Sequence, residues 1–158
     1  MIEQPEALKA RIYDVLETVM DPGMPILSIV DLGMVRSVET SPAPVVTITP
    51  TYIGCAALLE IVKNVRASLS EHEVGPVAVE IKHAPPWSSD WVSERGRAIM
   101  RANGIAPPPA RGNKTASRRC PACGSGVVQE ISAFGSSPCM SLWRCLDCRE
   151  PFGAFKCH

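Results

Sequence analysis

The chain has 158 residues, a length that fits one domain of common size or one domain with a small appendage. Its 46% apolar and 20% charged residues are typical of a folded globular protein and exclude a disordered or fibrous one. Sixteen basic residues balance sixteen acidic ones, which excludes binding to nucleic acid or an anionic membrane through bulk charge. Without a signal-peptide pattern or an apolar run near the roughly 18 residues of a membrane span, we expect a cytoplasmic protein with no membrane partner.

The first half of the chain predicts a helix followed by a hairpin. Apolar residues recur at helical spacing over residues 5–20, and Pro5 suits a first helical turn. Residues 21–25 include two prolines and a glycine, so they end this helix. Short strands over residues 32–39 and 45–49, joined by a proline-rich turn, complete the hairpin.

A crossover unit and a last helix follow the hairpin. Helical spacing returns over residues 55–69, and residues 77–81 alternate apolar and polar side chains like a strand buried on one side. Ser88, Ser89 and Asp90 offer a cap for a helix that runs to Asn103 and ends at Gly104. These elements predict an α+β fold with a small mixed three-stranded sheet packed with helices.

Two changes of composition divide the chain. Residues 104–117 contain three consecutive prolines between glycines, which predicts a linker after a domain over residues 1–103. The first 103 residues hold nine basic and thirteen acidic residues, whereas the remaining 55 hold seven and three. The zero net charge is therefore the cancellation of an acidic body and a basic tail.

The tail also holds six of the seven cysteines, and four of them form two C-x2-C pairs. Cys120 and Cys123 precede Cys145 and Cys148, with 21 residues between the pairs. Two such turns supply the four thiolates of a tetrahedral zinc site, and Gly124 suits the positive φ that follows a second ligand. Short strands over residues 127–131 and 141–144 would join the turns. Residues 118–158 therefore predict a C-terminal zinc ribbon.

The zinc is predicted to be structural. A piece of about 40 residues buries too little apolar surface to fold alone, so metal binding would supply its folding free energy. Four closed thiolates leave no open catalytic position. A redox C-x-x-C pair and an iron–sulfur cluster on the same four thiolates remain as alternatives.

Three further residues in the tail that could bind metal are not part of the predicted zinc site. Cys139, Cys157 and His158 could form a second, weaker metal site, used for transfer. The alternative for Cys139 is a small buried hydrophobic residue beside Phe134.

Cys55 is the lone cysteine of the body and follows Gly54 at the predicted start of a helix. Amide groups and the helix dipole at that position stabilise a thiolate, which suits a nucleophile or a soft metal ligand. An inert core cysteine is the alternative. His72 and His83 are isolated in the sequence, so a Cys–His hydrolase is a weak rival. Asp21 belongs first to turn chemistry.

Two segments resemble a known family. Residues 21–35, Asp-Pro-Gly-Met-Pro-Ile-Leu-Ser-Ile-Val-Asp-Leu-Gly-Met-Val, and residues 49–55, Thr-Pro-Thr-Tyr-Ile-Gly-Cys, are similar to the SufT-like metal–sulfur cluster assembly domain. This match covers about residues 5–103. With the ribbon and the tail segment 150–158 added, the whole chain resembles the PaaD family, which belongs to the ring-1,2-phenylacetyl-CoA epoxidase system of phenylacetate degradation.

The resemblance implies a role for two residues. The acidic-proline stretch and the cysteine of the Gly-Cys turn are the functional residues of the family, and they correspond to Asp21 and Cys55. Gly23 stands where the family usually has Glu, and Ala56 stands where Pro is common. The first departure removes an oxygen ligand and weakens any metal site at Asp21.

The resemblance predicts an accessory or maturation factor that assists assembly of the iron or iron–sulfur centres of the epoxidase and performs no catalysis on its substrate. The predicted partners are the epoxidase components, with transient iron or an iron–sulfur cluster as cargo. The ribbon would dock through basic and aromatic residues, namely Arg144, Arg149, Phe152, Phe155 and Lys156, and the alternative for them is ordinary ribbon packing and a solvated face. The alternatives are a nucleic-acid-binding zinc ribbon, which an acidic body argues against, and a thiol enzyme that uses Cys55. Whether the chain forms a homodimer is left open.

Overall fold

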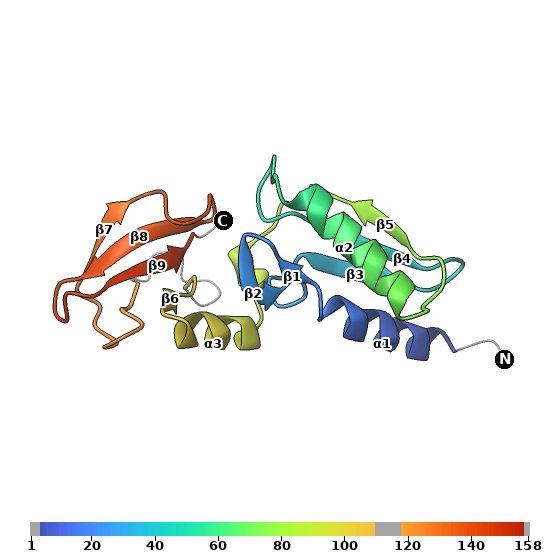
Figure 1. Ribbon diagram of the computed structural model, residues 1–158, viewed down its shortest axis with the longest axis horizontal. Coiled ribbons are helices and arrows are strands. Elements are labelled where there is room, and N and C mark those ends of the chain that lie inside the picture. The colour runs from blue at the N-terminus through green and yellow to red at the C-terminus, as the bar shows by residue number, and fades with distance from the viewer. Residues whose placement is uncertain (1–3, 110–117, 157–158) are drawn as a thin grey trace. The chain divides into compact units, whose positions relative to one another are not determined.

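The computed structural model of the protein describes residues 4–109 and 118–156 (Figure 1). The chain divides into two compact units, Met1–Trp87 and Ser88–His158, which we call the N-terminal unit and the C-terminal unit. The predicted first domain ended at residue 103, whereas residues 88–103 group with the C-terminal unit. No helix in the described ranges is long and apolar enough to span a membrane.

The described part of the N-terminal unit, from residue 4 onward, forms two helices and five strands. Their order along the chain is α1 (Pro5–Leu16), β1 (Met20–Asp21), β2 (Met24–Ser28), β3 (Val35–Glu39), β4 (Val45–Ile48), α2 (Leu58–Glu71) and β5 (Ala78–Ile81). Strand β4 lies between antiparallel β3 and parallel β5, so the predicted mixed three-stranded sheet is confirmed. Strands β1 and β2 form a separate antiparallel hairpin.

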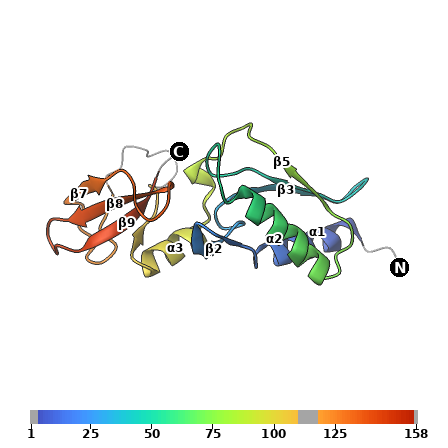
Figure 2. The same ribbon diagram turned by 45° about the horizontal axis from the view of Figure 1, so that its top comes forward.

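The core of this unit lies between the helices and the sheet. Helix α1 packs against α2, and Figure 2 shows both helices on the same side of the sheet. Ile12 and Leu16 of α1, Ile61 and Val65 of α2, and Val46 of β4 are fully buried. The apolar residues at helical spacing are thus the ones that α1 and α2 bury.

Several predicted boundaries of the N-terminal unit were wrong. Helix α1 ends at Leu16 rather than residue 20, because Met20 pairs with Ser28 in the β1–β2 hairpin, which was not predicted. The strand expected from residue 32 begins at Val35, because residues 32–34 turn with Gly33 at φ +72°. Helix α2 begins at Leu58, three residues after Cys55.

The C-terminal unit begins with helical turns. A short 3-10 helix, Ser89–Trp91, is capped by Ser88, and helix α3 (Glu94–Ala102) has its own cap, with Ser93 Oγ accepting the Gly96 N–H at 2.9 Å. The single helix predicted from the serine cap to Asn103 was therefore wrong, because this second cap starts a new helix. Gly104 closes α3 at φ +72°, as expected.

A four-stranded sheet follows α3. The strands β6 (Ile105–Ala106), β7 (Val128–Ser132), β8 (Met140–Cys145) and β9 (Pro151–Phe155) are ordered β6-β9-β8-β7. The predicted hairpin between the cysteine pairs is confirmed as β7 and β8. Strand β6 pairs in parallel with β9, so the predicted linker begins inside the sheet of the ribbon. Residues 110–117 of that linker lie outside the described residues.

Candidate metal centre

Two turns of the same construction present four of the six cysteines of the C-terminal unit, namely Cys120, Cys123, Cys145 and Cys148. In the first turn the Cys120 N–H donates to the Ser125 carbonyl at 2.8 Å, and in the second the Cys145 N–H donates to the Glu150 carbonyl at 2.9 Å. The residue after each second cysteine is left-handed, Gly124 at φ +77° and Arg149 at φ +70°. We call these turns the first and second knuckle. The positive φ expected at Gly124 is confirmed.

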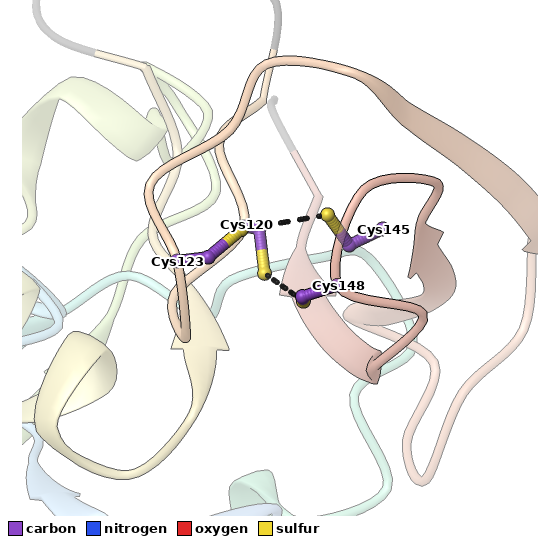
Figure 3. Close-up of side chains that lie close together, drawn as sticks. All are labelled: Cys120, Cys123, Cys145 and Cys148. Carbon is purple, nitrogen blue, oxygen red and sulfur yellow. Dashed lines mark hydrogen bonds between the residues drawn. The ribbon is translucent and has the colours of Figure 1, made fainter.

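The four sulfurs of the knuckles converge on one point (Figure 3). All four Sγ atoms lie within 4.8 Å of one another, and the Cys120–Cys148 and Cys123–Cys145 pairs lie 3.7 and 3.6 Å apart. Sulfurs at a zinc–sulfur distance of about 2.3 Å stand roughly 3.8 Å apart at the corners of a tetrahedron. The donor set and its spacing therefore fit a tetrahedral zinc ion, with Cys120, Cys123, Cys145 and Cys148 as its ligands.

The two thiols of the second knuckle differ in pKa, because the neighbouring thiols lower the pKa of Cys145 and raise that of Cys148. N–H groups of Cys148 and Asp147, together with neighbouring thiols, lower the pKa of Cys145 to about 7. The Glu150 N–H lowers the pKa of Cys148. Lost hydration and the three neighbouring thiols together outweigh this effect and raise the pKa of Cys148 to about 12. Zinc binds thiolates, so metal binding here releases protons and weakens as the pH falls.

The apolar surroundings of the metal centre are small. Two of the predicted ligands, Cys120 and Cys145, belong to a buried cluster with Ala106, Phe152 and Ala154. Phe155 is also buried, so Phe152 and Phe155 are core residues of the ribbon and the expectation that they would dock a partner was wrong. Because so small a core contributes little folding free energy, metal ligation must supply much of the folding free energy of the ribbon.

The three groups predicted to form a second metal site are described only in part. Cys139 is buried outside the four-cysteine group, with its Sγ 3.0 Å from Ser137 Oγ. Its burial fits the alternative of a small hydrophobic residue, although Phe134 is 75% exposed. Cys157 and His158 lie outside the described residues, so the second site stays a prediction.

Asp21 closes the turn of the β1–β2 hairpin. Its carboxylate accepts N–H groups from Met24 and Gly23, while burial, the larger effect, raises its pKa above the usual 3.8. A Cβ at Gly23 would lie 3.2 Å from Asp21 Oδ2. These contacts give Asp21 a structural role in the turn, and its functional role stays a prediction.

Cys55 lies in the loop between β4 and α2 and is half-buried. Gly54 before it has φ +80°, and the Cys55 carbonyl accepts the Leu58 N–H at 3.2 Å. Two large apolar side chains of the same region are exposed, Ile53 at 86% and Leu59 at 81%. Exposed apolar side chains therefore flank Cys55 in the sequence. Cys55 lies before the first turn of α2, so its predicted position at the start of that helix was wrong. His72 and His83 are exposed.

Sequence reasoning missed the left-handed residue of the second knuckle. Arginine seldom adopts positive φ, so Arg149 carries no compositional signal. The signal that could have found it is its position, since it follows Cys148 as Gly124 follows Cys123.

Comparisons with known proteins match a different family to each of the two units. The family described as "PaaD zinc beta ribbon domain" matches residues 105–156, and that described as "Iron-sulfur cluster assembly protein" matches residues 9–81. A crystal structure of a domain of unknown function, DUF59, from Bacillus anthracis matches with a TM-score of 0.57 and 34% identity, over 61% of this chain and 93% of that one.

Two curated proteins are similar in sequence. The putative D subunit of 1,2-phenylacetyl-CoA epoxidase from Escherichia coli (strain K12) is 39% identical over 150 residues, which are 92% of this chain and 91% of the relative. The Fe-S protein maturation auxiliary factor YitW of Bacillus subtilis (strain 168) is 37% identical over 98 residues, 60% of this chain and 95% of that protein.

Fold and metal centre together define an iron–sulfur cluster assembly domain followed by a zinc ribbon. Within that class, the chain belongs to the PaaD family of phenylacetyl-CoA epoxidase subunits. The predicted resemblance is thereby confirmed.

Proposed function

We propose that this chain is an accessory factor that assists assembly or insertion of the iron or iron–sulfur centres of a multicomponent phenylacetyl-CoA epoxidase, without acting on the substrate. The observation that carries the proposal is that one chain combines an iron–sulfur cluster assembly domain with a PaaD zinc ribbon. The iron–sulfur cluster assembly family matches residues 9–81, 60% of the chain is similar to a protein named as an Fe-S protein maturation auxiliary factor, and 92% is similar to one named as a putative epoxidase subunit.

Each unit has its own part in the proposal. Cys55 is the transient thiolate for iron or a cluster as cargo, because thiolates are soft ligands suited to both. The half-burial of Cys55 leaves it accessible from its loop, and exposed Ile53 and Leu59 offer apolar contact to a client protein. Asp21 holds the β1–β2 turn. The zinc of the ribbon is structural, because its four thiolates close the site.

The epoxidase components are the proposed partners, and the ribbon is the part that recognises them. Exposed Arg144 and Arg149 leave the ribbon surface positively charged, which suits an acidic partner surface. Cys139, Cys157 and His158 form a second, weaker metal site in this proposal. A Cys139→Ser, Cys157→Ser double variant is expected to hold less metal than the native chain, and full native metal content would contradict that site.

The role of Cys55 is tested by producing the epoxidase components with three forms of the chain. These are the native chain, Cys55→Ala and the neighbouring control Ala56→Ser, which adds a hydroxyl but keeps the thiol. Iron and acid-labile sulfide are then measured in the purified components. We expect the native and Ala56→Ser chains to support equal loading and Cys55→Ala to lower it at least several-fold. Native loading with Cys55→Ala would overturn the role of the thiol.

A further inference from the structure

A cavity of about 420 Å³ lies within the C-terminal unit beside the first knuckle. Its lining comes from the end of α3, from the proline stretch that follows β6, and from the start of the first knuckle, including Cys120 and Gly124. This volume falls in the range of pockets that hold small molecules. The cavity is separate from the point on which the four sulfurs converge, although Cys120 contributes to both.

Apart from Cys120, which is a thiolate when zinc is bound, the charged side chains of the described lining are all basic. Arg101, Arg118 and Arg119 line the cavity, and none of its described lining residues is acidic. Pro107, Pro108 and Pro109 add apolar surface to the same lining. Arg101 is remote in sequence from the other two, so the fold creates this cluster.

Two of the arginines are held by neighbouring groups. The Arg118 guanidinium lies 5.5 Å from the centre of the Trp143 ring, and the Trp143 indole N–H donates to Ser141 Oγ at 2.8 Å. Arg119 Nη1 donates to the Gly124 carbonyl at 3.2 Å. A guanidinium has five N–H groups, so this one bond leaves most of the Arg119 donors for a ligand. Such positioning reduces the entropy lost when a ligand binds.

We propose that this cavity binds a small phosphate-bearing organic molecule, with a nucleoside diphosphate as the representative of the class. Several arginine side chains in one lining match the charge and the several acceptor oxygens of phosphate, whereas one guanidinium suffices for a single carboxylate. The apolar proline surface accommodates the organic part of the ligand. A half-enclosed volume of this size suits a small molecule rather than a nucleic acid strand.

The metal centre supports this phosphate site. Cys120 is next to Arg119, and the Gly124 carbonyl that fixes Arg119 belongs to the first knuckle. Loss of zinc would release the knuckle and separate Arg119 from Arg101. Removal of the metal from the full chain should therefore abolish phosphate binding.

The test uses the zinc-loaded full chain and isothermal titration calorimetry in about 150 mM sodium chloride, which screens weak surface binding. The probes are inorganic phosphate, ADP, a tetraglutamate peptide and a single-stranded oligonucleotide. We expect ADP to bind most tightly and to be displaced by excess phosphate. No binding of ADP, or tighter binding of the peptide or of the oligonucleotide, would overturn the proposal.

Matched variants locate the site. Arg101→Gln should weaken ADP binding about ten-fold and keep full zinc content, because Arg101 belongs to α3 and is not one of the four predicted zinc ligands. Arg144→Gln makes the same change of charge in the same unit outside the cavity lining and should bind ADP like the native chain. Equal affinities of the two variants would contradict the assignment.

Discussion

The two units of this chain reach a folded state by different physical means. In the N-terminal unit, two amphipathic helices cover a mixed sheet, and fully buried Ile, Leu and Val side chains fill the space between them. In the C-terminal unit, two of the four predicted metal ligands are themselves members of the small buried cluster. The N-terminal unit has an apolar core that does not include Cys55, so its stability does not require this thiol. The fold of the ribbon depends on its thiols because two of them are part of its core.

The largest expected effect is loss of the ribbon without its metal. Cys145→Ser, or chelation of zinc, should remove amide hydrogen-exchange protection from β7, β8 and β9 and leave α1 and α2 protected. Structural zinc contributes about 10–16 kcal/mol of apparent binding free energy in small zinc domains, more than the remaining core of the ribbon supplies.

The control for this experiment is Cys139→Ser, which alters a buried cysteine outside the four-cysteine group. It should keep the protection of the ribbon strands. Retained protection of β8 after chelation would show that the apolar core suffices and would remove the contrast between the units.

The next largest effect is expected from a substitution in the apolar core of the N-terminal unit. Ile61→Ala removes a fully buried side chain of α2, and the cavity should lower the free energy of unfolding of the N-terminal unit by about 2–5 kcal/mol. Leu59→Ala, on the same helix but 81% exposed, should change it by less than about 0.5 kcal/mol. Urea unfolding of both variants measures the difference, and zinc content should be unchanged. Equal destabilisation would contradict the assigned core.

A smaller effect is expected at the knuckles. Gly124→Ala should destabilise the zinc-loaded ribbon by about 1–2 kcal/mol, because a left-handed residue with a Cβ is strained although space is open there. Arg149→Gly should relieve the same strain and stabilise the ribbon by about 0.5 kcal/mol after the entropy cost of glycine. Thermal unfolding with zinc present checks both. Shifts of the same sign would show that the two knuckles are not equivalent.

The smallest effect concerns Asp21 and pH. Burial raises its folded-state pKa above 3.8, so the folded state binds more protons than the unfolded state between these two pKa values. The stability contributed by this group is therefore complete below pH 3.8 and is lost as the pH rises through the raised pKa.

Asp21→Asn should accordingly stabilise the N-terminal unit at pH 7, and the gain should shrink as the pH falls toward 4. Urea unfolding at several pH values measures this trend. Asp14→Asn, an exposed position on α1, should show little dependence. A gain for Asp21→Asn that grows on acidification would contradict the sign.

The sequence predicted the parts of this molecule that local pattern encodes. Helical spacing located α1 and α2, and the C-x2-C spacing located the metal ligands, because a two-residue spacer alone orients both sulfurs. It did not predict the pairing of β6 with β9 or the cluster of Arg101 with Arg118, because both depend on contacts between segments remote in sequence. Strands β1 and β2 were missed because two residues and a proline-containing segment carry little periodic signal.

The proposed function is assistance by this chain in loading iron or iron–sulfur centres into the epoxidase components. The most direct measurement is the iron and acid-labile sulfide content of the epoxidase components, produced in otherwise identical cells with and without this chain. We predict that components made without it contain several-fold less iron or sulfide and that supplying the native chain restores them. Equal metal loading in both preparations would contradict the maturation role.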